Sequence, residues 1–138
     1  IGSKEFVQVN RSFTHKVGCV RGMHFQKPPH CEAKLIQCLR GKIFDVAVDL
    51  RRDSPTFLKW VGVELAEDKN LAIYIPEGFA HGFQTLEDNK EVFYQMSRMY
   101  VPESARGIRW DDQAFGIQWP LDRRVISKSD QAYPDFAL

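Results

Sequence analysis

The sequence predicts an all-β fold: a sandwich or barrel of short strands, followed by an irregular C-terminal tail. Between about residue 6 and residue 97, short apolar runs follow one another and helical periodicity is scarce. Turn-forming groups separate the runs, namely KPPH, RG, DSP, EDKN and EDNK. Many short, regularly spaced strands with turns between them are typical of β-sandwiches and β-barrels.

Each predicted strand is an apolar or alternating run between two of these turns. In chain order the strands are FVQVN (6–10), CVRGMHF (19–25), AKLIQCL (33–39), KIFDVAVDL (42–50), LKWVGVEL (58–65), LAIYI (71–75), HGFQTL (81–86) and EVFYQMS (91–97). Alternation is clearest in the fourth strand, whose even-numbered residues share one face: Phe44, Val46, Val48 and Leu50.

The stretch after about residue 101 is irregular and rich in Pro and Asp. Its aromatic residues include Trp110, Phe115, Trp119 and Phe136. We expect this tail to wrap around the barrel and to be anchored by these side chains. No repeat, low-complexity tract or linker interrupts the chain, which predicts a single domain over residues 1–138.

Length, charge and cysteine content exclude several classes of protein. A chain of 138 residues, 43% of them hydrophobic, can bury one core. Its net charge of +1 argues against a general nucleic-acid surface, and no apolar run is long enough to span a membrane. The start, IGSKEFVQVN, lacks a signal-peptide pattern. Cys19, Cys31 and Cys38 form no CxxC pair, which indicates reduced thiols in a cytoplasmic protein.

Two assumed hairpins bring polar side chains onto facing positions. A hairpin centred on the KPPH segment places His24 opposite Lys34, on the same face. A second hairpin, centred on the EDNK turn, places His81 opposite Met96, with Tyr94 as its diagonal neighbour. Each polar residue alone has a structural explanation, such as a backbone hydrogen bond or a side chain that reaches the rim. Together they predict a polar cavity that holds a ligand.

The residue types in this cavity favour proton transfer without a metal. The chain has no HxH pair, and a cationic Lys34 beside His24 would oppose a divalent ion. A histidine can act as a base near neutral pH, and a protonated tyrosine can donate from another direction. A lysine supplies positive charge where an oxyanion develops. We therefore predict proton removal next to a carbonyl, with His24 as base, Lys34 at the enolate and Tyr94 returning the proton.

Several motifs in combination resemble one enzyme family. RGMHFQ, KLIQCLRGKIFDVAVDLRRDSPTF, KWVGVEL, YIPEGFAHGF, VFYQMS, IRWDD, GIQWPL and ISKSD are similar to the dTDP-4-dehydrorhamnose 3,5-epimerases, in the family's order and over nearly the whole chain. The resemblance implies a cupin-like jelly-roll barrel that is homodimeric, metal-free and without a cofactor. The family's reaction inverts C3 and C5 of a dTDP-4-keto-6-deoxyhexose, on the route to L-rhamnose and related deoxysugars.

The resemblance also implies roles for individual residues. His24 matches the family's base, Asp130 in ISKSD the aspartate that pairs with it, Lys34 the residue near the C4 oxygen, and Tyr94 the acid. The implied substrate-binding residues are Arg21 at the diphosphate, Gln8 and Asn10 on the nucleotide side, and His81 and Tyr100 in the pocket. An aspartate bonded to one imidazole nitrogen fixes the tautomer of the ring.

The chain departs from the family pattern at three places. Most of the family carries a further N-terminal segment before the FVQVN stretch, with strands that help to bind the nucleotide partly across the dimer. Here FVQVN lies almost at the start, which would leave a strand edge for a partner subunit to cover, so we expect a homodimer or larger assembly. Phe25 replaces a common tyrosine. Glu32 stands where glutamine is common and adds negative charge near a site meant for a diphosphate.

Two alternatives stay open on the sequence alone. Within enzymes, the protein could invert only C3 or only C5, or act on a different 4-keto sugar. In a different class, it could be a non-catalytic sugar-nucleotide-binding or assembly protein derived from this family. Deuterium exchange next to the ketone separates these classes, because a binder incorporates none.

Overall fold

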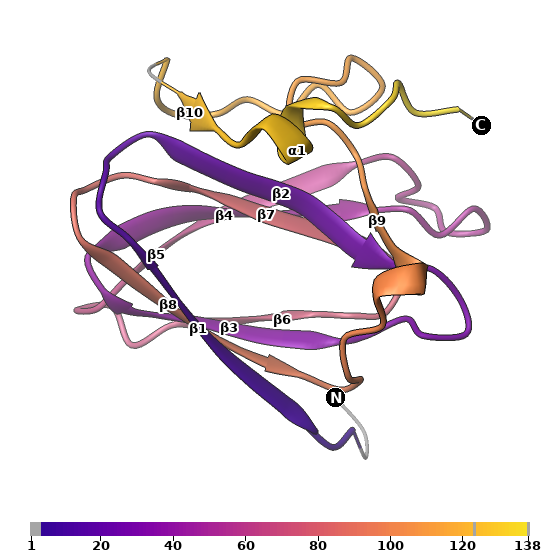
Figure 1. Cartoon of the computed structure of the whole chain (residues 1–138), viewed down its shortest axis with the longest axis horizontal. Coiled ribbons are helices and arrows are strands. Elements are labelled where there is room, and N and C mark those ends of the chain that lie inside the picture. The colour runs from indigo at the N-terminus through magenta and orange to yellow at the C-terminus, as the bar shows by residue number, and fades with distance from the viewer. Residues whose placement is uncertain (1–3, 123, 138) are drawn as a thin grey trace.

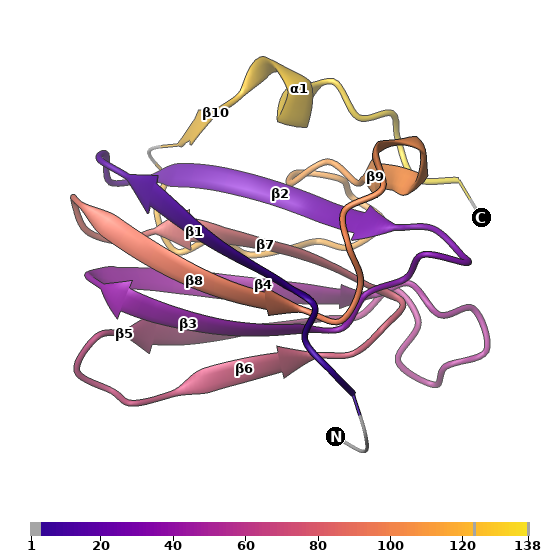
Figure 2. The same ribbon diagram turned by 60° about the horizontal axis from the view of Figure 1, so that its bottom comes forward.

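Two sheets stacked face to face form a jelly roll, and the C-terminal tail crosses the outer face of one of them (Figures 1 and 2). The computed structural model describes residues 4–122 and 124–137. Sheet A has the strand order β1-β8-β3-β6, with β1 Gln8–Thr14, β8 Lys90–Met96, β3 Lys34–Arg40 and β6 Ala72–Ile75. Sheet B has the order β10-β2-β7-β4-β5, with β10 Val125–Ile126, β2 Cys19–Gln26, β7 Phe79–Thr85, β4 Lys42–Asp49 and β5 Trp60–Ala66.

The remaining elements lie in the tail. The short 3-10 helix η1 (Pro102–Ser104) leads into β9 (Ala105–Gly107), which pairs with β2, and a single helical turn, α1, spans Lys128–Gln131. The all-β prediction is confirmed, and every predicted strand is present in the predicted order. The first strand differs most from its prediction, since β1 extends to Thr14 and pairs with β8 along its whole length. The single domain over residues 1–138 stays a prediction.

The predicted turns contain the residues that can adopt their backbone angles. Gly41, in the RG turn between β3 and β4, has a φ of +76°. Asn70 in EDKN and Asn89 in EDNK have φ values of +51° and +58°, in the left-handed region that Asn tolerates better than most residues. The strands therefore end at the predicted turns, whose Gly and Asn residues tolerate the required backbone angles.

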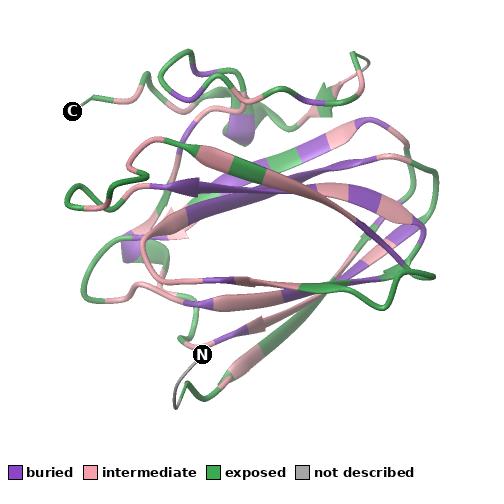
Figure 3. Ribbon diagram, turned by 180° about the vertical axis from the view of Figure 1, so that it is seen from behind, coloured by how far each residue is buried: buried purple, intermediate pink, exposed green. Residues whose placement is uncertain are grey.

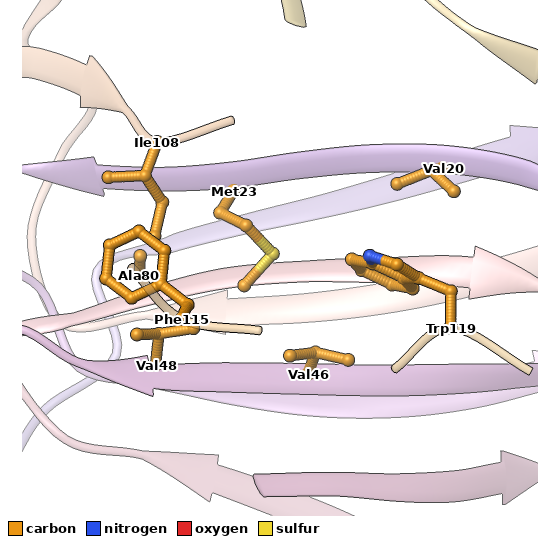
Figure 4. Packing of buried hydrophobic residues seen from close by; sticks show 8 residues of the cluster. All are labelled: Val20, Met23, Val46, Val48, Ala80, Ile108, Phe115 and Trp119. Atoms are coloured by element: carbon orange, nitrogen blue, oxygen red, sulfur yellow. The ribbon is translucent and has the colours of Figure 1, made fainter. Parts of the chain in front are cut away.

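Two apolar cores hold the layers together. The first lies between the sheets and contains Ile36, Cys38, Ile43, Ala47, Leu65, Ile75, Phe83 and Val92. The second lies between sheet B and the tail and contains Val20, Met23, Val46, Val48, Ala80, Ile108, Phe115 and Trp119 (Figure 4). The predicted anchoring of the tail by its aromatic residues is confirmed for Phe115 and Trp119, both 7% exposed. The indole N–H of Trp119 donates to the carbonyl of Trp110 at 2.9 Å, which satisfies its polar atom.

Strand β4 is buried on both faces, because the tail covers the side that would otherwise meet solvent. The alternating face predicted from Phe44, Val46, Val48 and Leu50 is a single face, and it packs against the tail. The opposite face looks into the space between the sheets and carries Asp45, which is fully buried. Burial is strongest in β4 and β7 and weakest in the edge strand β1 (Figure 3).

The two predicted hairpin registers are wrong. Strand β2 does not pair with β3: His24 stands opposite His81 and Gly107, whereas Lys34 stands opposite Ile75 and Met96. Strand β7 does not pair with β8 either. Both connections carry the chain from one sheet to the other, as jelly-roll connections do. The side chains that were predicted to face each other within a hairpin therefore belong to opposite sheets. No helix in the described ranges has the length and apolar character needed to cross a bilayer.

Candidate active site

A cavity of about 790 Å³ lies between the sheets and is closed on one side by the tail. Every site residue predicted from the sequence lines it: Gln8, Asn10, Arg21, His24, Lys34, His81, Tyr94, Tyr100 and Asp130. These side chains come from β1, β3 and β8 of sheet A, from β2 and β7 of sheet B, and from the tail. The predicted residues therefore share one cavity although the predicted registers were wrong.

A β-bulge in β2 places both Arg21 and His24 at the cavity. Arg21 stands opposite Phe83 and His24 opposite His81. The chain therefore advances three residues along β2 over the length in which β7 advances two. Residues three apart on a regular strand point to opposite faces, and the extra residue brings both to the same face. Met23, between them, points the other way into the core under the tail.

The glycines of RGMHF and AHGF let the two strands approach each other closely. A Cβ atom on Gly82 would lie 2.5 Å from the carbonyl oxygen of Arg21. A Cβ atom on Gly22 would lie 2.7 Å from the carbonyl oxygen of His81, and its φ of +120° is one that only glycine adopts without strain. Glycine at both positions therefore permits the close approach of the two strands that carry His24 and His81.

His24 and Asp130 form a histidine–carboxylate pair in one wall of the cavity. His24 Nε2 lies 2.7 Å from Asp130 Oδ1, and the N–H of Gly22 donates to Asp130 Oδ2 at 3.1 Å. Ser127 caps α1 by accepting from the Asp130 N–H at 3.1 Å, which holds the aspartate against β2. Burial alone would raise the pKa of Asp130, but the contact with His24 and the hydrogen bonds from Gly22 and Ser127 bring its pKa below the usual range.

The pair fixes the tautomer of His24. A carboxylate only accepts, so the neutral ring carries its proton on Nε2 and leaves Nδ1 as the basic nitrogen. The His24 side chain is 49% exposed and the Asp130 side chain 8% exposed. The histidine therefore reaches the open cavity while its partner is buried behind it.

A second histidine–carboxylate pair lies deeper. His81 Nε2 is 2.8 Å from Asp45 Oδ1, and both side chains are buried. Burial lowers the pKa of His81, and the nearby Lys34 and His24 lower it further, while Asp45 opposes the change. Asp45 was not predicted from the sequence. Its one signal was an acidic residue at an inward position of KIFDVAVDL, an otherwise apolar strand.

Lys34 and Tyr94 project into the same cavity from sheet A. The Lys34 side chain is 12% exposed, and burial lowers its pKa, while Glu32 opposes this shift. The ring of Tyr94 packs edge-on against His81 with centroids 6.0 Å apart. Burial raises the pKa of Tyr94, so its hydroxyl keeps its proton at neutral pH and can donate it.

The rim of the cavity is polar and cationic. Tyr100 donates its backbone N–H to Gln8 Oε1 at 2.7 Å, and Gln8 Nε2 donates to Asn10 Oδ1 at 3.3 Å. Arg98 and Arg106, which were not predicted from the sequence, line the same cavity as Arg21. A cationic rim with amide side chains suits a phosphorylated ligand.

Tyr133 also lines the cavity and was not predicted from the sequence. Its ring lies over Gly107, where a Cβ atom would overlap it, and edge-on to His24 with centroids 6.2 Å apart. The tail that carries it has no periodicity, so no sequence signal placed it near the histidine. Among the described residues, no three His, Cys, Asp or Glu side chains are grouped as a metal site requires.

Known proteins similar to this chain point to one family. The family model for dTDP-4-dehydrorhamnose 3,5-epimerase matches residues 1–137. A dTDP-4-dehydrorhamnose 3,5-epimerase of Sinorhizobium fredii is 45% identical over 129 residues, which are 93% of this chain and 66% of the relative.

Two solved structures have the same fold. The Bacillus anthracis dTDP-4-dehydrorhamnose 3,5-epimerase, with TDP and PPi bound, matches with a TM-score of 0.94 at 41% identity, over 96% of this chain and 76% of that one. A Legionella pneumophila 3,5-epimerase in complex with dTDP-4-keto-L-rhamnose matches with a TM-score of 0.90 at 40% identity, over 95% and 69%. The chain thus spans about two thirds to three quarters of the length of these proteins.

Proposed function

The chain belongs to the dTDP-4-dehydrorhamnose 3,5-epimerase family, and from that premise we propose that it epimerises a dTDP-4-keto-6-deoxyhexose. The inverted carbon is C3, C5 or both, each of which lies next to the C4 ketone. One observation carries the proposal: His24 and Tyr94 come from opposite sheets and line the same cavity. A sugar ring between them would present one face to a base and the other to an acid, which is what inversion requires.

The proposed reaction begins when His24 Nδ1 removes the proton from the carbon beside the ketone. The electrons of the broken C–H bond form the enolate, whose oxygen is stabilised by the ammonium of Lys34. Asp130 stabilises the imidazolium formed on His24, 2.7 Å away. Tyr94 then gives its phenolic proton to the same carbon from the other face. To complete the cycle, the His24 imidazolium releases its extra proton to solvent and the Tyr94 phenolate takes one up. No electron leaves or enters, so the reaction needs no redox cofactor.

The rim residues would hold the rest of the substrate. Arg21 is proposed to contact the diphosphate, Gln8 and Asn10 the nucleotide side, and Tyr100 the substrate at the opening. His81, held neutral by burial and with its Nε2 proton engaged by Asp45, would accept a hydrogen bond at Nδ1 on the floor of the cavity. The TDP and PPi in the Bacillus anthracis structure support a nucleotide-sugar ligand for this pocket.

We also expect the protein to work as a homodimer in the cytoplasm. Among the described residues, β1 is an edge strand of sheet A, and Val7, Val9 and Phe13 on or next to it are exposed. An apolar edge of this kind is usually covered by another subunit. Light scattering at micromolar concentration tests this, and a monomer would contradict it.

The test of function is NMR of dTDP-4-keto-6-deoxyglucose with the protein in D2O. Epimerisation should wash out the proton signal at C3, C5 or both and produce the signals of an inverted sugar. Binding without any deuterium incorporation would refute the enzymatic proposal. The carbons that exchange would also show whether one or both centres are inverted.

A further inference from the structure

Glu32 is a buried acid in the wall of the cavity that the proposed chemistry does not use. Its side chain is 7% exposed, and its Oε1 lies 3.6 Å from Lys34 Nζ. Its Oε2 is buried and accepts no hydrogen bond from the described residues. Burying a carboxylate in such a place is unfavourable unless attraction to a nearby positive charge offsets the lost hydration free energy.

The backbone fixes the two side chains together. Ala33, between them, is fully buried: its N–H donates to Ser97 Oγ at 2.8 Å, and its carbonyl accepts from the Ser97 N–H at 2.9 Å. Residues two apart on an extended chain point to the same face. Glu32 and Lys34 therefore face the cavity as neighbours, and the two hydrogen bonds between Ala33 and Ser97 hold the backbone that carries them.

The other ionisable groups around Lys34 do not replace Glu32. Asp45 on β4 attracts the ammonium, but its Oδ1 is engaged by His81 of β7 at 2.8 Å. His24 on β2 and Tyr94 on β8 line the same cavity and supply no negative charge when neutral. Among the described residues, Glu32 is the carboxylate that lies within ion-pair distance of Lys34.

We propose that Glu32 is a positioning residue that keeps Lys34 charged and aimed into the cavity. This rests on the proposed function in one respect, since the charge is needed for the enolate. Burial lowers the pKa of Lys34, and Glu32 is the larger of the two carboxylate influences that oppose it. Burial also raises the pKa of Glu32, opposed by Lys34 and Gln26, so each group supports the charge of the other.

The test reads the charge of Lys34 directly, without substrate. The ε-carbon of Lys34 is followed by NMR through a pH titration of protein labelled with ¹³C-lysine, with Lys34→Arg used for assignment. Glu32→Gln keeps the shape and removes the charge, and it should move the Lys34 titration down by about one pH unit or more. Glu77→Gln removes a half-exposed acid that pairs with Lys4; it is the matched control and should leave the titration in place.

A Lys34 titration that moves by less than about 0.3 pH units in Glu32→Gln overturns the inference. Glu32→Ala serves as a second variant and should give the same downward shift. Where the parent protein also catalyses exchange, the alkaline limb of its pH–rate profile should move down in parallel. A shifted titration in a protein that never exchanges deuterium would uphold the Glu32–Lys34 pairing and refute the proposed function alone.

Discussion

Replacing Asp130 with asparagine tests how the His24 pair works. Asparagine can still accept from the Gly22 N–H through its carbonyl oxygen, a contact of 3.1 Å in the parent. Its amide group then faces His24 Nε2, which lies 2.7 Å from the carboxylate in the parent. Because an amide N–H donates, Nε2 must accept, and the ring proton moves to Nδ1. The nitrogen that faces the sugar is then no longer basic.

The size of the effect follows from two contributions. A hydrogen bond to a charged group contributes about 1.5–3 kcal/mol, and the lower part of that range applies here because half of His24 is exposed. Losing it in the transition state costs about 10- to 30-fold in rate. The wrong tautomer adds to this, so we expect a total loss of about 10²- to 10³-fold, within the usual range for general base catalysis.

The assay is the initial rate of deuterium incorporation into dTDP-4-keto-6-deoxyglucose at neutral pH, at saturating substrate. Asp68→Asn, in an exposed turn, is the control for loss of one carboxylate and should keep the parent rate. The melting temperature of Asp130→Asn checks that the fold survives. A folded Asp130→Asn protein that exchanges within about threefold of the parent would refute the tautomer argument.

Three further predictions follow from the same structure. Tyr94→Phe should keep the exchange of deuterium from the His24 side but lose about 10²- to 10⁴-fold in inverted product, and equal loss of both would show that Tyr94 is not the acid. Exhaustive chelation should leave the exchange rate unchanged, and restoration of a lost rate by a divalent metal would contradict the metal-free mechanism. Gly82→Ala should destabilise the protein by about 1–3 kcal/mol in urea unfolding, since its Cβ would lie 2.5 Å from the Arg21 carbonyl; an unchanged midpoint would be the contrary result.

The strands could be predicted because their signals are local. Alternation marked the even-numbered face of KIFDVAVDL, and the residues of the RG and EDNK turns tolerate left-handed backbone angles. The pairing of strands is not local, since it depends on which connections pass from one sheet to the other. Both hairpin registers were wrong for that reason.

More of the candidate site than of the strand pairing could be predicted from the sequence. Inward-facing polar residues of a sandwich share one interior, whichever strands pair, so His24 and Lys34 line one cavity from opposite sheets instead of standing opposite each other in a hairpin. The resemblance to the family supplied Asp130, which no spacing could place. Asp45 and Tyr133 were missed because one lies in an apolar strand and the other in a tail without periodicity.

The most direct test of the proposed function is deuterium exchange in the His24→Ala protein. Dissolved in D2O with dTDP-4-keto-6-deoxyglucose, the folded variant should bind the nucleotide sugar with only modestly reduced affinity. It should incorporate deuterium at C3 and C5 at least about 10²-fold more slowly than the parent protein and form no inverted sugar. Exchange at the parent rate would show that His24 is not the base and would contradict the proposed mechanism.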